Sequence, residues 1–149
     1  MATDISASAD VIDVRDIIER FEELETKLSD AHEGESDSPE GTLDEYIREA
    51  AQDDAHILHE AATEFLTLQS LLEDLAGYGG DEQWRGDWYP SMLIHDMYFE
   101  YYARQLADDI SDVKLSNWPY TCIDWAQAAR ELQPDYSTVD YDGSTFWYQ

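Results

Sequence analysis

Two histidines close to acidic residues are the first candidates for chemistry in this chain. His56 and His59 stand one helical turn apart, with Asp53 and Glu64 nearby in the sequence. Imidazole and carboxylate groups ligate zinc and iron, so this group is a candidate metal site. The order His-Ile-Leu-His-Glu matches neither zincin pattern, because both place the glutamate between the histidines. We therefore expect polar residues on an exposed helix, with no metal ion and no cofactor, and keep a metal-dependent enzyme as an alternative.

The remaining candidate catalytic motifs are incomplete. Cys122 is the only cysteine, and its position just inside an expected helix start would favour a thiolate. No histidine or lysine is near it in sequence, and its apolar neighbours indicate a buried packing residue. The glycine-rich stretch 77–80 lacks the Lys-Ser/Thr of a phosphate-binding loop and precedes two acids, which would repel phosphate. We expect no catalytic residue and no enzyme.

The balance of charge carries more information than any motif. The chain has 35 acidic and 8 basic residues, for a formal charge of −27, far beyond the magnitude of roughly 2–8 that keeps a small domain soluble. The acids are spread along the whole chain. Such a surface repels nucleic acid and anionic membranes and attracts basic proteins. We therefore expect no direct binding to nucleic acid and no membrane association, and a basic DNA-binding protein as the partner.

The pattern of apolar residues predicts a mainly α (α+β) fold in a single acidic domain, 1–149. A long antiparallel helical hairpin is expected over 10–76, with helices at 10–31 and 42–76 and a mobile loop at 32–41. Thr42 and Glu45 have the spacing of a capping box, and Gly77 suits the end of the second helix. At about 1.5 Å per residue, that helix would be a rod of roughly 52 Å.

The second part, 77–149, is an aromatic-rich α+β region that holds all five tryptophans. A helix is expected from Pro90 to about Ile110, and a short one from the capping-box pair at 121 and 124. The tail predicts a β-hairpin around Asp142-Gly143. The Trp and Tyr residues are interpreted as core or as a protein interface. One cysteine, no long apolar run and no secretory signal favour the host cell cytosol.

An acidic rod of this length has the charge of a DNA segment. B-DNA carries one charge per roughly 1.7 Å, so about 52 Å presents roughly 30 phosphates, or about 15 base pairs. The candidate partner-binding residues are acids away from the apolar stripes: Asp16, Glu19, Glu22, Glu23, Glu25, Asp44, Glu45, Glu49, Asp53, Glu60, Glu64, Asp96, Glu100, Asp108, Asp109 and Asp112.

Three segments, 10–25, 93–107 and 118–132 with the following hairpin, resemble small acidic proteins of bacteriophages and mobile elements. The stretch 123–132, Ile-Asp-Trp-Ala-Gln-Ala-Ala-Arg-Glu-Leu, is more distantly similar to the C-terminal part of ArdA-type antirestriction proteins. That resemblance implies a DNA mimic that inhibits a host defence protein, and it leaves a homodimer open, since ArdA proteins commonly form dimers. Alternatives are a salt-adapted domain of ordinary function and a phage structural or assembly protein.

Overall fold

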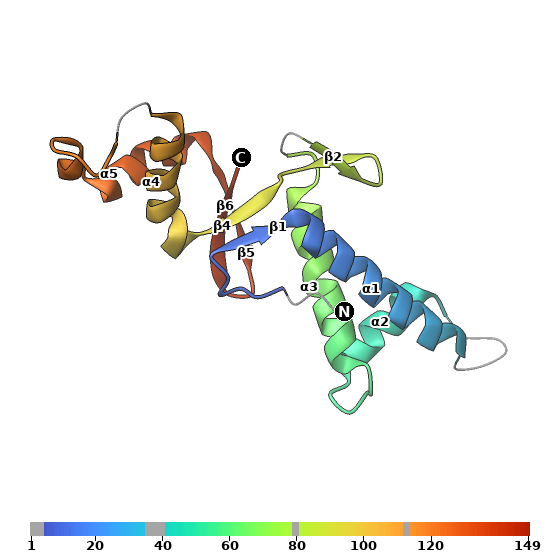
Figure 1. Cartoon of the computed structure of the whole chain (residues 1–149). Helices are drawn as coiled ribbons and strands as arrows, with labels where there is room; N and C mark the ends of the chain where they lie inside the picture. Colours follow the sequence, from blue (N-terminus) through green and yellow to red (C-terminus); the bar gives the residue numbers. More distant parts are fainter. Residues whose placement is uncertain (1–4, 35–40, 79–80, 112–113) are drawn as a thin grey trace.

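An antiparallel sheet lies between two groups of helices in the computed structural model, which describes residues 5–34, 41–78, 81–111 and 114–149 (Figure 1). The expected α+β class is confirmed. The elements are β1 (Val11–Asp13), α1 (Val14–Gly34), α2 (Leu43–Gln52), α3 (His59–Leu75), β2 (Asp81–Trp84), β3 (Asp87–Tyr89), β4 (Met92–His95), α4 (Phe99–Ile110), α5 (Trp125–Leu132), β5 (Ser137–Tyr141) and β6 (Ser144–Tyr148).

The first helix begins four residues later than predicted. Residues 11–13 form β1 instead, because Ile12 is buried and pairs with Leu93 of β4. At the start of α1 the Asp13 carboxylate accepts a hydrogen bond from the Arg15 backbone N–H at 2.9 Å. The helix then continues to Gly34, so the segment 32–34 of the expected loop is helical. Residues 35–40 lie outside the described part of the chain.

The second helix is not the continuous rod that the sequence predicted. It is divided into α2 and α3, because two side chains in the connecting segment bond to nearby backbone groups and compete with the helix. The Asp53 carboxylate accepts from the Ala55 backbone N–H at 3.0 Å, and Nδ1 of His56 accepts from Leu58 N–H at 3.0 Å. The capping box at Thr42 and Glu45 is confirmed at the start of α2.

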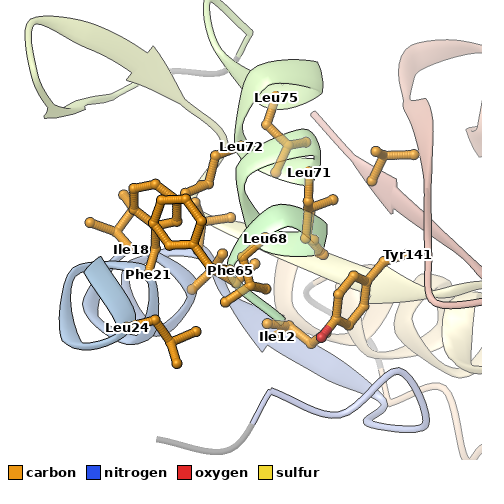
Figure 2. Close-up of a cluster of buried hydrophobic side chains, with 14 of the residues drawn as sticks. Ile12, Ile18, Phe21, Leu24, Phe65, Leu68, Leu71, Leu72, Leu75 and Tyr141 are labelled. Atoms are coloured by element: carbon orange, nitrogen blue, oxygen red, sulfur yellow. The ribbon is translucent and has the colours of Figure 1, made fainter. Parts of the chain in front are cut away.

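Helices α1, α2 and α3 with one face of the sheet enclose the main core. Phe21 of α1 stacks on Phe65 of α3, with ring centroids 4.6 Å apart. Leucines from the inner face of α3 and Tyr141 of β5 complete the cluster shown in Figure 2. We call these three helices and their core the helical body. Its stability comes from the burial of this apolar stripe, as in other amphipathic helices.

The four-stranded sheet has the order β1-β4-β6-β5, with every neighbouring pair antiparallel. The helix expected from Pro90 is wrong over its first six residues, since 92–95 form the inner strand β4. A 3₁₀ turn at Asp96–Tyr98 then leads into α4, which begins at Phe99. A short apolar run such as Met-Leu-Ile cannot be assigned to helix or strand from periodicity. Ile94 is a strand residue because it pairs with Val11 on one side and Trp147 on the other.

Two turns have the conformation that their local sequence predicts. Asp142 and Gly143 have φ values of 47° and 83°, which the tight turn of the C-terminal hairpin requires, so that predicted hairpin is confirmed. Gly77 follows the last residues of α3 at φ 87°, as a helix-ending glycine does. A second, unpredicted hairpin joins β2 and β3 through Arg85 and Gly86, whose φ values of 49° and 77° are also left-handed.

Helices α4 and α5 form a smaller unit at the far end of the sheet from the helical body (Figure 1), which we call the C-terminal lobe (residues 96–136). Its buried residues besides Ile94 of the sheet are few: Phe99, Ala103 and Ala129. Helix α5 begins later than predicted, because Asp124 itself is the N-cap and accepts from Gln127 N–H at 3.1 Å. Cys122 is exposed, which corrects the expected burial, because the whole 3₁₀ turn Tyr120–Cys122 in which it stands faces solvent.

Candidate protein-binding surface

The solvent-facing side of α1 holds a row of carboxylates. Asp16, Glu19, Glu23 and Asp30 recur at intervals of three, four and seven residues, which places them on one side of the helix, opposite its buried stripe. Glu22 and Glu33 flank this row, and with those four we call them the α1 acidic face. Over about 26 Å from residue 16 to residue 33, one DNA strand would present seven or eight phosphates at about 3.4 Å each.

Most of the α1 acidic face has no neutralising partner. Asp16, Glu19 and Asp30 are exposed and form no ion pair with any residue in the described part of the chain, and the same holds for the two flanking glutamates. Within this face, only Glu23 contacts a cation, at 3.4 Å from Nη1 of Arg20. Lys27 is exposed on the same side of the helix, one turn from Glu23 and from Asp30, so this side keeps an excess of negative charge that is only partly compensated.

Two of the predicted partner-binding acids form ion pairs that connect elements of the fold. The Glu64 carboxylate accepts two hydrogen bonds from the Arg20 guanidinium, at 2.7 and 2.8 Å, and ties α3 to α1. This bidentate contact raises the pKa of Arg20, so the guanidinium stays charged. Glu25 accepts from Nη2 of Arg85 at 3.0 Å and 3.2 Å, and holds the β2–β3 turn against α1. Neither carboxylate belongs to an outward-facing acidic row.

The other predicted acids on α2, on α3 and between them are exposed, and some of them bond to neighbouring groups of the fold. Asp44 pairs with Arg48 at 3.3 Å, and Glu45 belongs to the capping box. Asp53 caps the end of α2 and bonds in the turn that follows. Glu49 and Glu60 are exposed and make no ion pair within the described residues. This part of the molecule adds to the charge of the helical body without forming a second regular row.

The predicted acids of the second part lie at the other end of the molecule. Asp96 accepts a hydrogen bond from Nε1 of Trp147 at 2.9 Å. Glu100, Asp108 and Asp109 are exposed on α4, and Asp112 lies outside the described residues. Because α4 and α1 are separated by the sheet (Figure 1), these carboxylates do not extend the α1 acidic face. The structure therefore divides the predicted site into separate acidic areas.

The candidate metal-binding histidines are used in local contacts. Nδ1 of His56 caps the turn at Leu58, as described above. Nδ1 of His59 lies 3.1 Å from the Ala50 carbonyl oxygen, and its Nε2 lies 3.4 Å from a carboxylate oxygen of Asp54. Within the described residues there is no group of three or more His, Cys, Asp or Glu side chains placed to hold a metal ion.

Sequence reasoning missed two kinds of residue. Asp30 and Glu33 continue the α1 acidic face, and the same three- and four-residue spacing as at Asp16 and Glu19 could have found them. The exposed apolar side chains of the C-terminal lobe could not have been found, since tryptophan and tyrosine there fitted a core equally well. Trp118, for example, is 80% exposed.

Comparisons with protein-family models, with curated proteins and with solved structures gave no match for this chain. Among the described residues, there is no helix both long and apolar enough to cross a membrane.

Proposed function

We propose that this protein is a non-catalytic DNA mimic that inhibits a host DNA-binding defence protein, such as a restriction enzyme or a CRISPR-type effector. The observation that carries the proposal is the α1 acidic face, a row of carboxylates with the approximate linear charge density of one DNA strand. The phage-like and ArdA-like segments of the sequence agree with it. The inhibitor would occupy the basic groove of its target and block access of DNA.

The distribution of the cations supports this role. Arg20 and Arg85, at the edges of the core, bind acids that connect elements of the fold, while Asp16, Glu19 and Asp30 form no ion pair with any described residue. A row of carboxylates on a helix is also preorganised, because the helix fixes their spacing before binding. Such a surface gains from electrostatic steering towards a lysine- and arginine-lined groove.

The length of the mimicked segment is shorter than the sequence indicated. With the second helix divided at Asp53–Leu58, the longest regular acidic row is the one on α1. Its roughly 26 Å matches about eight base pairs at about 3.4 Å each. The proposed contact is therefore a groove that grips a short stretch of duplex.

The test is binding to purified restriction and CRISPR effectors, with and without competing duplex DNA, at low and moderate salt. A triple reversal on the α1 acidic face, Asp16→Lys with Glu19→Lys and Asp30→Lys, should weaken binding by about 100-fold and flatten its salt dependence. The matched control carries the same charge change elsewhere, as Glu73→Lys, Asp74→Lys and Glu131→Lys, and should weaken binding much less. Retention of no DNA-binding protein by the native chain at moderate salt contradicts the proposal.

The salt-adapted alternative has a separate test. A domain adapted to high salt needs molar salt to fold, since its acids repel one another in dilute buffer. We expect the chain to show its helical circular dichroism and a cooperative melting transition in buffer without added salt. Folding that appears only above about 1 M salt, where the Debye length is about 3 Å, would favour salt adaptation.

A further inference from the structure

Strand β5 forms an open edge of the four-stranded sheet. It is the last strand in the order β1-β4-β6-β5, and among the described strands it pairs only with β6. Its five residues stay in register with β6 without a bulge, and they include neither proline nor lysine. Bulges, prolines and lysines commonly protect an edge strand from pairing with another chain. β5 therefore keeps the ability to accept a further strand, and it is longer than the three-residue edge strand β1.

The tight turn of the hairpin determines which backbone groups of β5 point outward. A two-residue turn makes Tyr141 and Ser144 a hydrogen-bonded pair, and hydrogen-bonded and non-hydrogen-bonded pairs then alternate along the two strands. Thr138 and Asp140 occupy non-hydrogen-bonded positions, so their N–H and C=O groups point away from β6. No residue in the described part of the chain forms a hydrogen bond with these backbone groups.

The two faces of β5 differ in exposure. Ser137, Thr138 and Asp140 are exposed, whereas Val139 and Tyr141 are buried against the helical body. Figure 2 shows Tyr141 within the same core cluster as the leucines of α3. The strand is therefore anchored by its inner face, while its outer face and its outer edge remain accessible.

A hollow of about 370 Å³ adjoins the C-terminal end of β5. Tyr141 and Asp142 line one side of it, and Glu60, Thr63 and Thr67 of α3 line the other. The two carboxylates, Glu60 and Asp142, are exposed and form no ion pair within the described residues. Because α3 packs on β5, the inward-pointing side chains of an added strand would lie beside α3 and reach this hollow. Its carboxylate and hydroxyl oxygens are acceptors for a lysine or arginine side chain.

We propose that the outer edge of β5 binds, by strand addition, an extended segment of the target protein that carries lysine or arginine. Backbone hydrogen bonds to Thr138 and Asp140 supply affinity in this mode of recognition, and the alternate side chains supply specificity. Exposed acids stand along the edge at Asp135, Asp140 and Asp142, so a basic segment is complementary to it. A second copy of this chain is a poorer occupant, because it would bring a second set of the same acids to this edge.

This inference rests on the proposed function for the identity of its partner and adds a second contact to it. The α1 acidic face attracts the basic grooves of many DNA-binding proteins alike. Strand addition requires in addition an extended basic segment that can present its backbone to β5. The β5 edge would therefore restrict binding to those targets that have such a segment.

The first experiment uses a peptide in place of the target. The probe is an end-blocked peptide of alternating lysine and threonine, added at about 0.15 M salt to screen weak attraction between exposed charges. Hydrogen exchange at the amides of Thr138 and Asp140, followed by NMR, should slow about fivefold, because these groups become hydrogen-bonded. The amides of Val139 and Tyr141, which face β6, should change much less. The matched control peptide has glutamate in place of lysine and should give no protection.

Two variants test the edge itself. Thr138→Pro removes an N–H that points away from β6, so the hairpin is retained while the outer edge loses a donor. Thr138→Lys keeps the backbone and adds a positive charge beside the incoming segment. Each should weaken peptide binding about tenfold. The matched control Thr121→Lys makes the same change at an exposed position of the lobe and should retain binding, and melting temperatures show that the variants are folded.

Attraction by charge alone gives a different result. Binding of the basic peptide without protection of Thr138 and Asp140 overturns the inference, and so does an equal loss of binding in Thr138→Lys and Thr121→Lys.

The second experiment separates the two proposals on a captured effector. Thr138→Lys should weaken binding about tenfold, mainly through faster dissociation. If reversals on the α1 acidic face weaken binding and Thr138→Lys does not, the inference is overturned and the proposed function stands. If the basic peptide protects the β5 edge but the native chain retains no DNA-binding protein, the proposed function is overturned and the edge remains a site for an extended basic segment.

Discussion

The helical body and the C-terminal lobe distribute the same residue types in opposite ways. In the helical body most large apolar side chains are inside, the arginines are paired and the unpaired acids face solvent. The exceptions include Ile57 between α2 and α3, which is 94% exposed, and Lys27 of α1, which forms no ion pair within the described residues. In the lobe few residues are buried, large apolar side chains are exposed and the cations have no ion pair within the described residues. This difference indicates that the helical body is held together by a large core, whereas the lobe has only a small one.

The largest expected effect is a loss of stability that differs between the core of the helical body and the core of the lobe. Phe65→Ala should destabilise the helical body by about 3–5 kcal/mol, because it leaves a cavity against Phe21 in a closely packed cluster. Urea unfolding followed by circular dichroism measures this loss. In contrast, Phe99→Ala should expose the amides of α4 and α5 to hydrogen exchange while the body stays protected. Equal loss of protection in both parts would show that they unfold as one unit.

A smaller effect is expected from the ion pair between α1 and α3. Glu64→Ala removes the two carboxylate oxygens that accept from the partly buried Arg20 guanidinium at 2.7 and 2.8 Å and leaves it only the longer contact with Glu23, so it should cost about 1.5–3 kcal/mol of unfolding free energy. The control is Glu60→Ala, one turn earlier on the same helix and exposed, which should change stability by less than about 0.5 kcal/mol. In the lobe, Arg104→Ala should likewise cost little, since that guanidinium forms no ion pair with any of the described residues. If Arg104→Ala lost as much unfolding free energy as Glu64→Ala, the expected difference between the two parts of the molecule would be contradicted.

Removal of the N-cap of α2 should cause a small loss of stability within the helical body. Thr42→Ala removes the hydroxyl that accepts from Glu45 N–H at 3.2 Å and should cost about 1 kcal/mol. Thr42→Asp, which retains an N-cap acceptor, should restore most of that loss. Chemical denaturation of the three proteins measures it, and an unchanged midpoint for the alanine variant would show that α2 does not depend on its cap.

The smallest expected effect appears only at alkaline pH and in the lobe. Burial, followed by the hydrogen bond with Tyr102 at 2.8 Å, raises the pKa of Tyr136. The unfolded chain therefore releases this proton first, near pH 10, and the lobe loses stability as pH rises from there towards the folded-state pKa. Tyr136→Phe should remove this part of the alkaline dependence, as measured by melting from pH 8 to pH 11. The same slope in both proteins would contradict it.

Local sequence signals were sufficient to predict some structural elements and insufficient to predict others. The turn at Asp142-Gly143 and the capping box at Thr42 were predicted, because each depends on a few consecutive residues. The break after Gln52 was missed because no glycine or proline marks it; the side chains of Asp53 and His56 produce it. Of the candidate site, the row on α1 was predicted in part. The ion pairs of Glu25 and Glu64 could not be predicted, since their arginine partners are distant in sequence.

The sequence by itself determined the charge of −27, the α+β class and the amphipathic stripe of α1, because these follow from composition and from periodicity along a single helix. Only the tertiary structure decided that residues 11–13 and 92–95 are strands, that the arginines of the body neutralise particular acids, and that Tyr101, Trp118 and Tyr120 of the lobe are exposed. The physical reason is that strand pairing, ion pairing and burial each need a second segment, whose position the local sequence does not specify.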